Sequence, residues 1–167
     1  MGEDKEVFSQ KIKCKGMFNY TELYNFCYNW FKKDEDYLLY EEEYLEKLAG
    51  GAKEVKIKWK AEKKITDYYQ FVFELKWHII GMTDAEAEEN GKKVKTNKGD
   101  LTIEVKAKLK RDYEETWDKK PFWKFLRGIY DRYIMRTTQD QYEIRLMQKA
   151  QEFVANTKAF LNMEGKE

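Results

Sequence analysis

The clearest alternation of hydrophobic and polar positions lies between Thr66 and Ile80. Successive side chains of a β-strand point to opposite faces of a sheet, so a period of two predicts a half-buried strand. The predicted inward face consists of Tyr69, Phe71, Phe73, Leu75, Trp77 and Ile79, and the outward face of Tyr68, Gln70, Val72, Glu74, Lys76 and His78. Each aromatic ring buries roughly 150–250 Å² when covered, so we expect this strand to organise the core.

A first strand and a short helix are predicted before it. Residues 6–16 alternate, with Phe8, Ile12 and Cys14 on one side and Lys11, Lys13 and Lys15 on the other. The following stretch, to about Lys33, has a spacing of three to four residues that predicts an amphipathic helix. Its stripe contains Tyr20, Leu23, Phe26 or Cys27, and Trp30. Asn19 or Thr21 is suited to cap the first turn.

Gly50-Gly51 predicts a two-residue hairpin between residues 37–48 and 53–65, because the primed turns require a positive φ that glycine adopts freely. A register centred on the two glycines pairs Lys60 with Glu41, Lys58 with Glu43, Trp59 with Glu42, Ile57 with Tyr44 and Ala61 with Tyr40. Opposite charges then face each other and the apolar residues share one face, so two patterns agree. Across a short turn near residues 64–66, we expect Phe71 beside Trp59 and Phe73 beside Ile57.

Asn90-Gly91 predicts a second hairpin. It pairs acid with base, and its expected pairs are Glu89 with Lys92, Glu88 with Lys93, Glu86 with Lys95, and Ala87 with Val94. Residues 96–100 have the composition of another turn. The strand after them directs Leu101, Ile103, Val105, Ala107 and Leu109 inward.

From Pro121 the period of the apolar positions becomes helical. The first part of the stripe contains Phe122, Phe125, Leu126, Ile129, Tyr130, Tyr133 and Ile134. Thr137-Thr138 is a predicted break or bend, and Thr138 with Gln141 has the spacing of a capping box. The stripe continues through Tyr142, Leu146, Ala150, Phe153, Thr157 and Phe160, flanked by Met147, Val154 and Leu161.

The predicted fold class is α+β, in a single domain over residues 1–167. An antiparallel sheet of 6–7 strands (region 6–116) carries a short helix after its first strand, and a long C-terminal helical region (121–163) packs on its apolar face. This order resembles the helix-grip architecture of the START and Bet v 1-like superfamily, in which a curved sheet wraps a long C-terminal helix. The chain departs from that pattern in having one helix between the first two strands. The tail LRGIYDRYI…FLNM also resembles small uncharacterised archaeal proteins, which implies no activity.

Composition narrows the functional classes. A hydrophobic content of 42% excludes a disordered chain, and 32 basic against 31 acidic residues leave no global field that favours nucleic acid. No apolar run reaches the roughly 18 residues of a membrane span, and MGEDKEVF lacks the apolar segment of a signal peptide. We therefore expect a cytoplasmic protein. Cys14 and Cys27 are then reduced, packed thiols, with a disulfide or a reactive thiol as the alternative.

The helix-grip resemblance implies a ligand cavity between the sheet and the C-terminal helix. The predicted cavity residues are Tyr40, Glu42, Trp59, Phe71, Phe73, Trp77, Tyr130 and Tyr133. The alternative is that these large side chains simply fill the core. Glu42 is expected on the apolar face beside Trp59, where a carboxylate needs a partner such as Arg127, Arg132 or a tyrosine hydroxyl. A position at the rim of the sheet is the alternative for Glu42.

Two surfaces are candidates for interaction. The outward lysine rows are Lys11/Lys13/Lys15, Lys56/Lys58/Lys60 and Lys106/Lys108/Lys110. They lack the interleaved aromatic residues that stack on bases, so a solvated face is favoured over phosphate binding. Trp123, Arg127, Arg132 and Arg136 form an aromatic–arginine surface that would contact another subunit or a membrane, and packing of this segment on the sheet is the alternative.

Catalytic motifs are missing from the sequence. His78 is the only histidine and Ser9 the only serine, so a histidine-based triad or a zinc site of the usual ligand number is excluded. There is no P-loop, GxGxxG or CxxC motif. We predict a non-enzymatic helix-grip-like domain without cofactor or metal, which binds a small apolar ligand. The alternative is a structural or assembly protein, either a homo-oligomer or bound to another protein.

Overall fold

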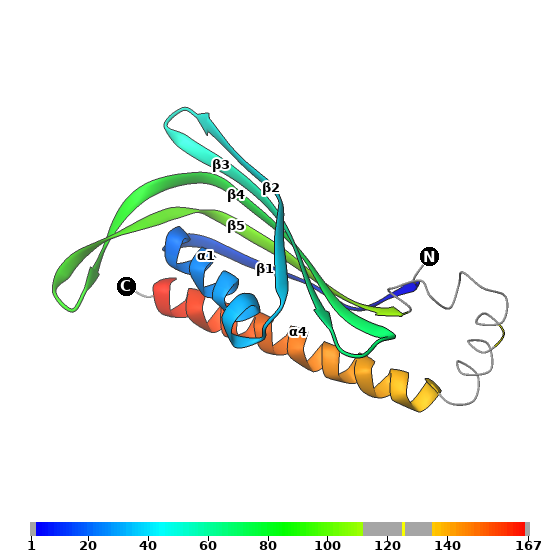
Figure 1. Cartoon of the computed structure of the whole chain (residues 1–167). Coiled ribbons are helices and arrows are strands. Elements are labelled where there is room, and N and C mark those ends of the chain that lie inside the picture. Colours follow the sequence, from blue (N-terminus) through cyan, green and yellow to red (C-terminus); the bar gives the residue numbers. More distant parts are fainter. Residues whose placement is uncertain (1–2, 112–124, 126–134, 166–167) are drawn as a thin grey trace.

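Five antiparallel strands form one curved sheet, and the helices lie on its concave side (Figure 1). The structure is a computed structural model that describes residues 3–111, 125 and 135–165. The elements in chain order are β1 (Glu3–Phe18), α1 (Tyr20–Asn29), the π-helical segment η1 (Trp30–Asp34), β2 (Leu38–Ala49), β3 (Ala52–Lys64), β4 (Tyr69–Glu89), β5 (Lys92–Arg111) and α4 (Met135–Gly165). The strand order in the sheet is β1-β5-β4-β3-β2, so β1 pairs with the last strand and the others form a meander. The α+β class and the antiparallel sheet are confirmed.

The predicted number of strands is too high because two turn-like stretches lie inside long strands. β4 passes through Gly81, and β5 passes through residues 96–100, where we had expected a turn. The register shifts between Ile80 and Thr83, which marks a β-bulge at Gly81 with φ +66°. Across the pair, a Cβ on Gly99 would lie 3.1 Å from the Cα of Met82, so glycine permits this close approach. Bulges bend a strand without ending it. The predicted pairs around Asn90-Gly91 are confirmed.

The β2–β3 hairpin is present, but its register changes halfway along. The pairs nearest the turn, including Glu43 with Lys58 and Tyr44 with Ile57, are confirmed. A bulge between Glu41 and Glu43 then inserts Glu42 as an extra residue, so Trp59 pairs with Glu41. The three predicted pairs beyond it are wrong: Lys60 faces Tyr40, Ala61 faces Leu39, and Glu42 faces no residue of β3.

The register between β3 and β4 was also wrong, by an even number of residues. Trp59 pairs with Leu75, Ile57 pairs with Trp77, and Phe71 pairs with Lys63. The connection between the strands is longer than expected, and the Thr66 hydroxyl accepts bonds from the N–H groups of Tyr68 (3.1 Å) and Tyr69 (3.0 Å). An even shift keeps every side chain on its own face. The predicted inward residues therefore stay on the core face despite the wrong pairing. Gln70 and Val72, which were predicted to be outward and solvent-facing, are nevertheless buried, to 6% and 4% exposure.

The core lies between the sheet and the helices. Every predicted inward residue of β4 is buried, and so are the predicted inward residues of β5. Leu146, Ala150, Phe153 and Thr157 of α4 are fully buried, as their spacing predicted, whereas Met147 is exposed. Thr137 and Thr138 lie inside α4, so the helix is not broken there and Thr138 does not cap it.

The first helix begins as its sequence predicts, but α1 ends at Asn29 and the π-helical η1 continues it to Asp34. The side chain of Asn19 caps α1 by accepting a bond from the N–H of Glu22 at 3.0 Å, and Leu23 and Cys27 are buried. Neither α1 nor α4 combines the length and apolar character of a membrane-crossing helix. Most of the predicted stripe over residues 121–134 lies outside the described residues. Phe125, which is described, is 65% exposed rather than packed.

Candidate functional site

The residues predicted to line an apolar cavity are separated by the fold. Trp59, Phe71, Phe73 and Trp77 are buried, and their rings contact other rings: Trp59 lies 5.2 Å from Trp77, and Phe73 lies 5.2 Å from Phe31 of η1. Side chains therefore fill this part of the interior. Tyr40 is half exposed and pairs with Lys60 on the face away from the helices.

The remaining candidates are described in part. Arg136 lies in α4. The others are outside the described residues: Tyr130, Tyr133, Trp123, Arg127 and Arg132.

The carboxylate beside Trp59 belongs to Glu41, and the prediction that assigned it to Glu42 is wrong. The Glu41 carboxylate accepts bonds from the Tyr24 hydroxyl at 2.6 Å and from the Trp59 indole N–H at 3.1 Å. Glu42 is the bulge residue and is exposed. Successive residues of a strand face opposite sides of the sheet. The extra residue at the bulge therefore places Glu41, and not Glu42, on the face that carries Trp59.

Glu41 and Glu42 provide a matched pair of substitutions. Glu41→Ala removes the acceptor of the buried Trp59 N–H, so we expect a loss of about 1–3 kcal/mol in the free energy of unfolding. Both glutamates are exposed, but Glu42 makes neither of the bonds of Glu41, so Glu42→Ala is expected to change the free energy of unfolding by less than about 0.5 kcal/mol. Urea denaturation of both variants measures the difference. Equal losses would contradict the bulge.

Tyrosines on one face of α1 connect the helix to β2. The hydroxyls of Tyr20 and Tyr44 lie 2.7 Å apart, and Tyr44 donates to Glu46 at 2.8 Å. Burial, followed by the hydrogen bond to Tyr44, raises the pKa of Tyr20, and burial followed by the bond to Glu41 raises the pKa of Tyr24. A hydroxyl with a raised pKa is a poor base near neutral pH. This network is suited to holding α1 on the sheet.

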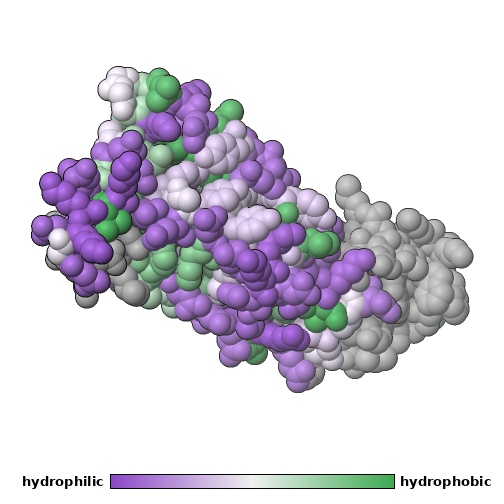
Figure 2. Space-filling model, turned by 60° about the vertical axis from the view of Figure 1, so that its left-hand side comes forward, coloured by the Kyte–Doolittle hydropathy of each residue, from purple (hydrophilic) through white to green (hydrophobic). Residues whose placement is uncertain are grey.

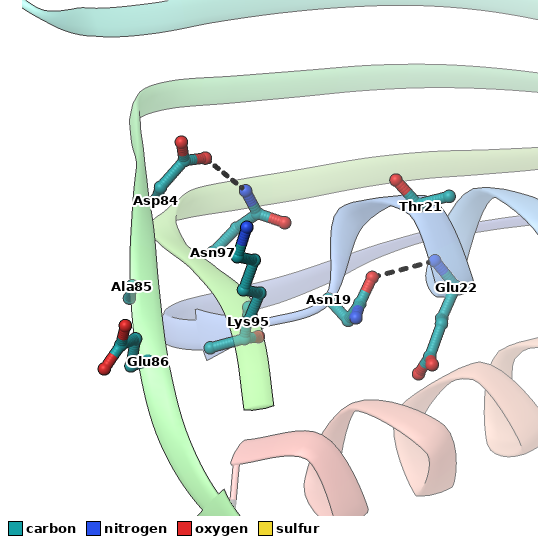
Figure 3. A pocket seen from close by; sticks show the side chains of 9 residues that line it. Asn19, Thr21, Glu22, Asp84, Ala85, Glu86, Lys95 and Asn97 are labelled. Carbon is teal, nitrogen blue, oxygen red and sulfur yellow. Dashed lines mark hydrogen bonds between the residues drawn. The ribbon is translucent and has the colours of Figure 1, made fainter. Parts of the chain in front are cut away.

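An open cleft of about 700 Å³ lies where the start of α1 faces the outer half of the β4–β5 hairpin. Figure 3 shows Lys95 and Asn97 of β5 on one side and Asn19 and Glu22 on the other. The remaining lining residues are Thr21, Asp84, Ala85, Glu86 and Thr96. A second cleft of about 350 Å³ shares Thr21, Asp84 and Asn97 and extends to Gly51 and Lys53 at the β2–β3 turn.

Asn97 fixes the walls of this cleft. Its side-chain oxygen accepts a bond from the backbone N–H of Tyr20 at 3.0 Å, and its amide donates to Asp84 at 3.4 Å. One side chain of β5 therefore connects the start of α1 to β4. Asn97 was not predicted as a site residue, because an asparagine followed closely by glycine is typical of a turn. The polar residues of the predicted turn were the only feature of the sequence that could have indicated a binding site here.

The outward lysine rows face away from the helices and meet acids. Lys108 lies 3.0 Å from Glu74, Lys60 lies 3.2 Å from Glu62, and Lys106 lies 3.3 Å from Glu104. His78 is on the same face, 3.5 Å from Glu54. Such mixed charge fits a solvated surface better than a phosphate-binding one.

Within the described ranges, neither the two cysteines nor any group of potential metal ligands forms a reactive centre. Cys14 and Cys27 are both free thiols. Burial raises the pKa of Cys27 to about 12, and burial followed by the charge of Asp100 raises that of Cys14. The thiolate is the nucleophilic form, so neither residue is activated at neutral pH. Histidine, cysteine, aspartate and glutamate side chains do not gather in threes that could hold a metal ion in this part of the chain.

Comparisons of the chain with protein-family models, curated proteins and solved structures gave no match.

Proposed function

We propose that the protein is a non-enzymatic, helix-grip-like binding domain that takes a small polar ligand in the cleft beside α1. The cleft itself carries the proposal. Its volume of about 700 Å³ is within the roughly 300–1,000 Å³ of small-molecule pockets. The order β1-β5-β4-β3-β2, with α4 across the concave face, supports the helix-grip part, since a curved sheet around a C-terminal helix is what that resemblance implies.

The chemistry of the lining favours a polar ligand over an apolar one. The lining contains the carboxylates of Glu22, Asp84 and Glu86, the ammonium group of Lys95, and the amides of Asn19 and Asn97. Such a set supplies both donors and acceptors, which orient a ligand that carries both. Because Asn97 already ties two walls together, the cleft is largely formed before a ligand arrives.

The same lining supports binding rather than nucleophilic catalysis. The residues around the cleft, all of them described, include no histidine, cysteine or serine. Nucleophilic catalysis pairs an activated hydroxyl or thiol with a base, and among these lining residues neither Thr21 nor Thr96 is hydrogen-bonded to a carboxylate or to Lys95. The role of the cleft residues is therefore recognition.

Native mass spectrometry of the freshly purified chain tests the proposal, together with a fragment screen followed by amide chemical shifts. Ala85→Trp fills the cleft, and Ala159→Trp on the exposed side of α4 is the matched control. We expect ligand or fragment binding in the wild type and in the control, and a loss in Ala85→Trp at unchanged melting temperature. Fragments that shift no cleft amides, or that bind Ala85→Trp equally well, would contradict it.

Two sequence-based predictions stay predictions. An apolar ligand under α4 would have to displace rings such as Trp59 and Phe73, which are at most 1% exposed. Contact through the aromatic–arginine surface involves residues that are, apart from Arg136, outside the described range.

A further inference from the structure

The edge strand β2 exposes far more apolar surface than the rest of the sheet. In the described part of the chain β2 pairs with β3 alone, so its other edge is open. Five of its large side chains are exposed: Leu38, Tyr40, Tyr44, Leu45 and Leu48, the last to 77%. Hydrophobic residues are visible at the top of Figure 2, where the tip of the β2–β3 hairpin lies. An open, apolar edge is a template for pairing with another strand.

The opposite edge of the sheet is protected in the usual way. β1 exposes Lys11, Lys13 and Lys15, while Ile12 and Phe18 are buried. Alternating lysines discourage edge-to-edge association because they would be brought against one another. The two edges of the same sheet therefore differ, and only β2 has the character of a contact.

We propose that β2 is a homodimerisation edge, at which two copies of the chain pair their β2 strands antiparallel about a two-fold axis through Leu45. The axis runs perpendicular to the sheet, so the two sheets become one continuous sheet. This inference is independent of the proposed ligand cleft.

Charge selects this register. With Leu45 opposite its own copy, Glu43 of each chain faces Lys47 of the other, and Tyr44 faces Glu46. The two-fold axis produces each of these contacts twice. Opposite charges directly across an antiparallel pair stabilise it by roughly 0.2–1 kcal/mol. The strand is therefore complementary to itself.

The neighbouring registers are all worse. An axis through Glu46 or through Lys47 would place a charged residue against its own copy, and like charges directly opposite are destabilising. An axis through Tyr44 would set Glu43 against Leu45 and Glu46 against Glu42, which is again a pair of like charges, whereas the axis through Leu45 sets Leu48 against the bulge residue Glu42. The residues that this register pairs without a bulge, 43–47, lie within the regular segment between the bulge and the turn.

The fold leaves room for the second copy. In Figure 1 the outer half of the β2–β3 hairpin projects beyond α1 and α4, so this part of β2 is clear of the helices of its own chain. Glu43 and Lys47 already face Lys58 and Glu54 of β3 inside the hairpin. On the open side of β2, a second copy would continue the same alternation of opposite charges, which an unrelated strand would match only by chance. A second copy is the occupant that the charges fit.

Charge exchange tests the register. In sedimentation-velocity runs with the full chain, Glu43→Lys and Lys47→Glu should each raise the dimer Kd about ten-fold or more, since two attractive pairs become repulsive. The double variant restores both pairs and should return within about three-fold of the wild type. Circular dichroism and melting temperature verify that each variant is folded. A wild-type chain that is monomeric at its highest soluble concentration, or a double variant as weak as the single ones, overturns the proposal.

A cross-linking experiment gives an answer that does not depend on the folding of the charge variants. Directly opposed residues of antiparallel strands have Cα atoms about 4.5–5.5 Å apart, within reach of a disulfide. Leu45→Cys in a Cys14→Ser background should therefore form a covalent dimer under mild oxidation. Ser9→Cys in the same background, exposed on β1, should not. Equal cross-linking of both variants would reject β2 as the contact, and cross-linking of Ser9→Cys alone would move the contact to β1.

Discussion

Replacing Phe73 with alanine is expected to lower the free energy of unfolding by about 3–5 kcal/mol. The ring is fully buried and lies 5.2 Å from Phe31, 5.5 Å from Tyr37 and 6.2 Å from Trp30. Those partners come from η1 and from the residue that precedes β2, so Phe73 joins the sheet to the segment that follows α1. Truncation would remove apolar contact and leave a cavity that rigid rings around it cannot close.

The measurement is urea denaturation at equilibrium, with the slope of the transition compared between variants. Lys76→Ala is the control, because Lys76 is on the same strand but exposed on the other face, and it should change stability by less than about 0.5 kcal/mol. A loss below about 1 kcal/mol for Phe73→Ala would show that this face of β4 is not the core.

Periodicity predicted which face of β4 and β5 forms the core but not every buried residue, because Tyr68, Gln70 and Val72, which were predicted outward, are buried as well. The alternation in β4 and β5 and the three-to-four spacing in α4 each identify the apolar face of one element. That face can be predicted without knowing which element packs against it. This is why the inward residues of β4 were correct although the pairing of β4 with β3 was wrong. An even error of register leaves the faces unchanged.

Strand number could not be predicted, because a glycine-rich stretch has the same local signal in a turn and in a bulge. Gly81 and residues 96–100 favour a reversal of the chain when each is considered alone. They lie opposite each other in the sheet, so together they bend a long hairpin. A turn and a bulge can be distinguished only when the strand that pairs with the stretch is known.

The residues of the candidate cleft could not be predicted from the sequence for a related reason. Asn19, Asp84 and Asn97 come from three distant parts of the chain and meet because β5 lies between β1 and β4. Each residue alone has an ordinary explanation as a cap or a turn former. The carboxylate beside Trp59 was assigned to Glu42 because the bulge was not predicted. Three consecutive glutamates contain no apolar residue, so the hydrophobic pattern could not locate the inserted residue.

Replacing Phe153 with alanine is expected to cost about 3–5 kcal/mol as well, because α4 is held to the protein through this ring. Phe153 is fully buried and lies 4.9 Å from Trp30 and 5.0 Å from Phe31, whereas Ile144 of the same helix is exposed. Ile144→Ala is the matched control and should stay within about 0.5 kcal/mol.

The double variant Phe73→Ala, Phe153→Ala distinguishes a shared cluster from two separate contacts. Both rings contact Trp30 and Phe31, so the double variant should lose less stability than the two single losses added together, by about 0.5 kcal/mol or more. Strict additivity would mean that sheet and helix are anchored independently. A shared cluster would instead make η1 the element on which β4 and α4 both depend, and loss of either ring would loosen the other's attachment.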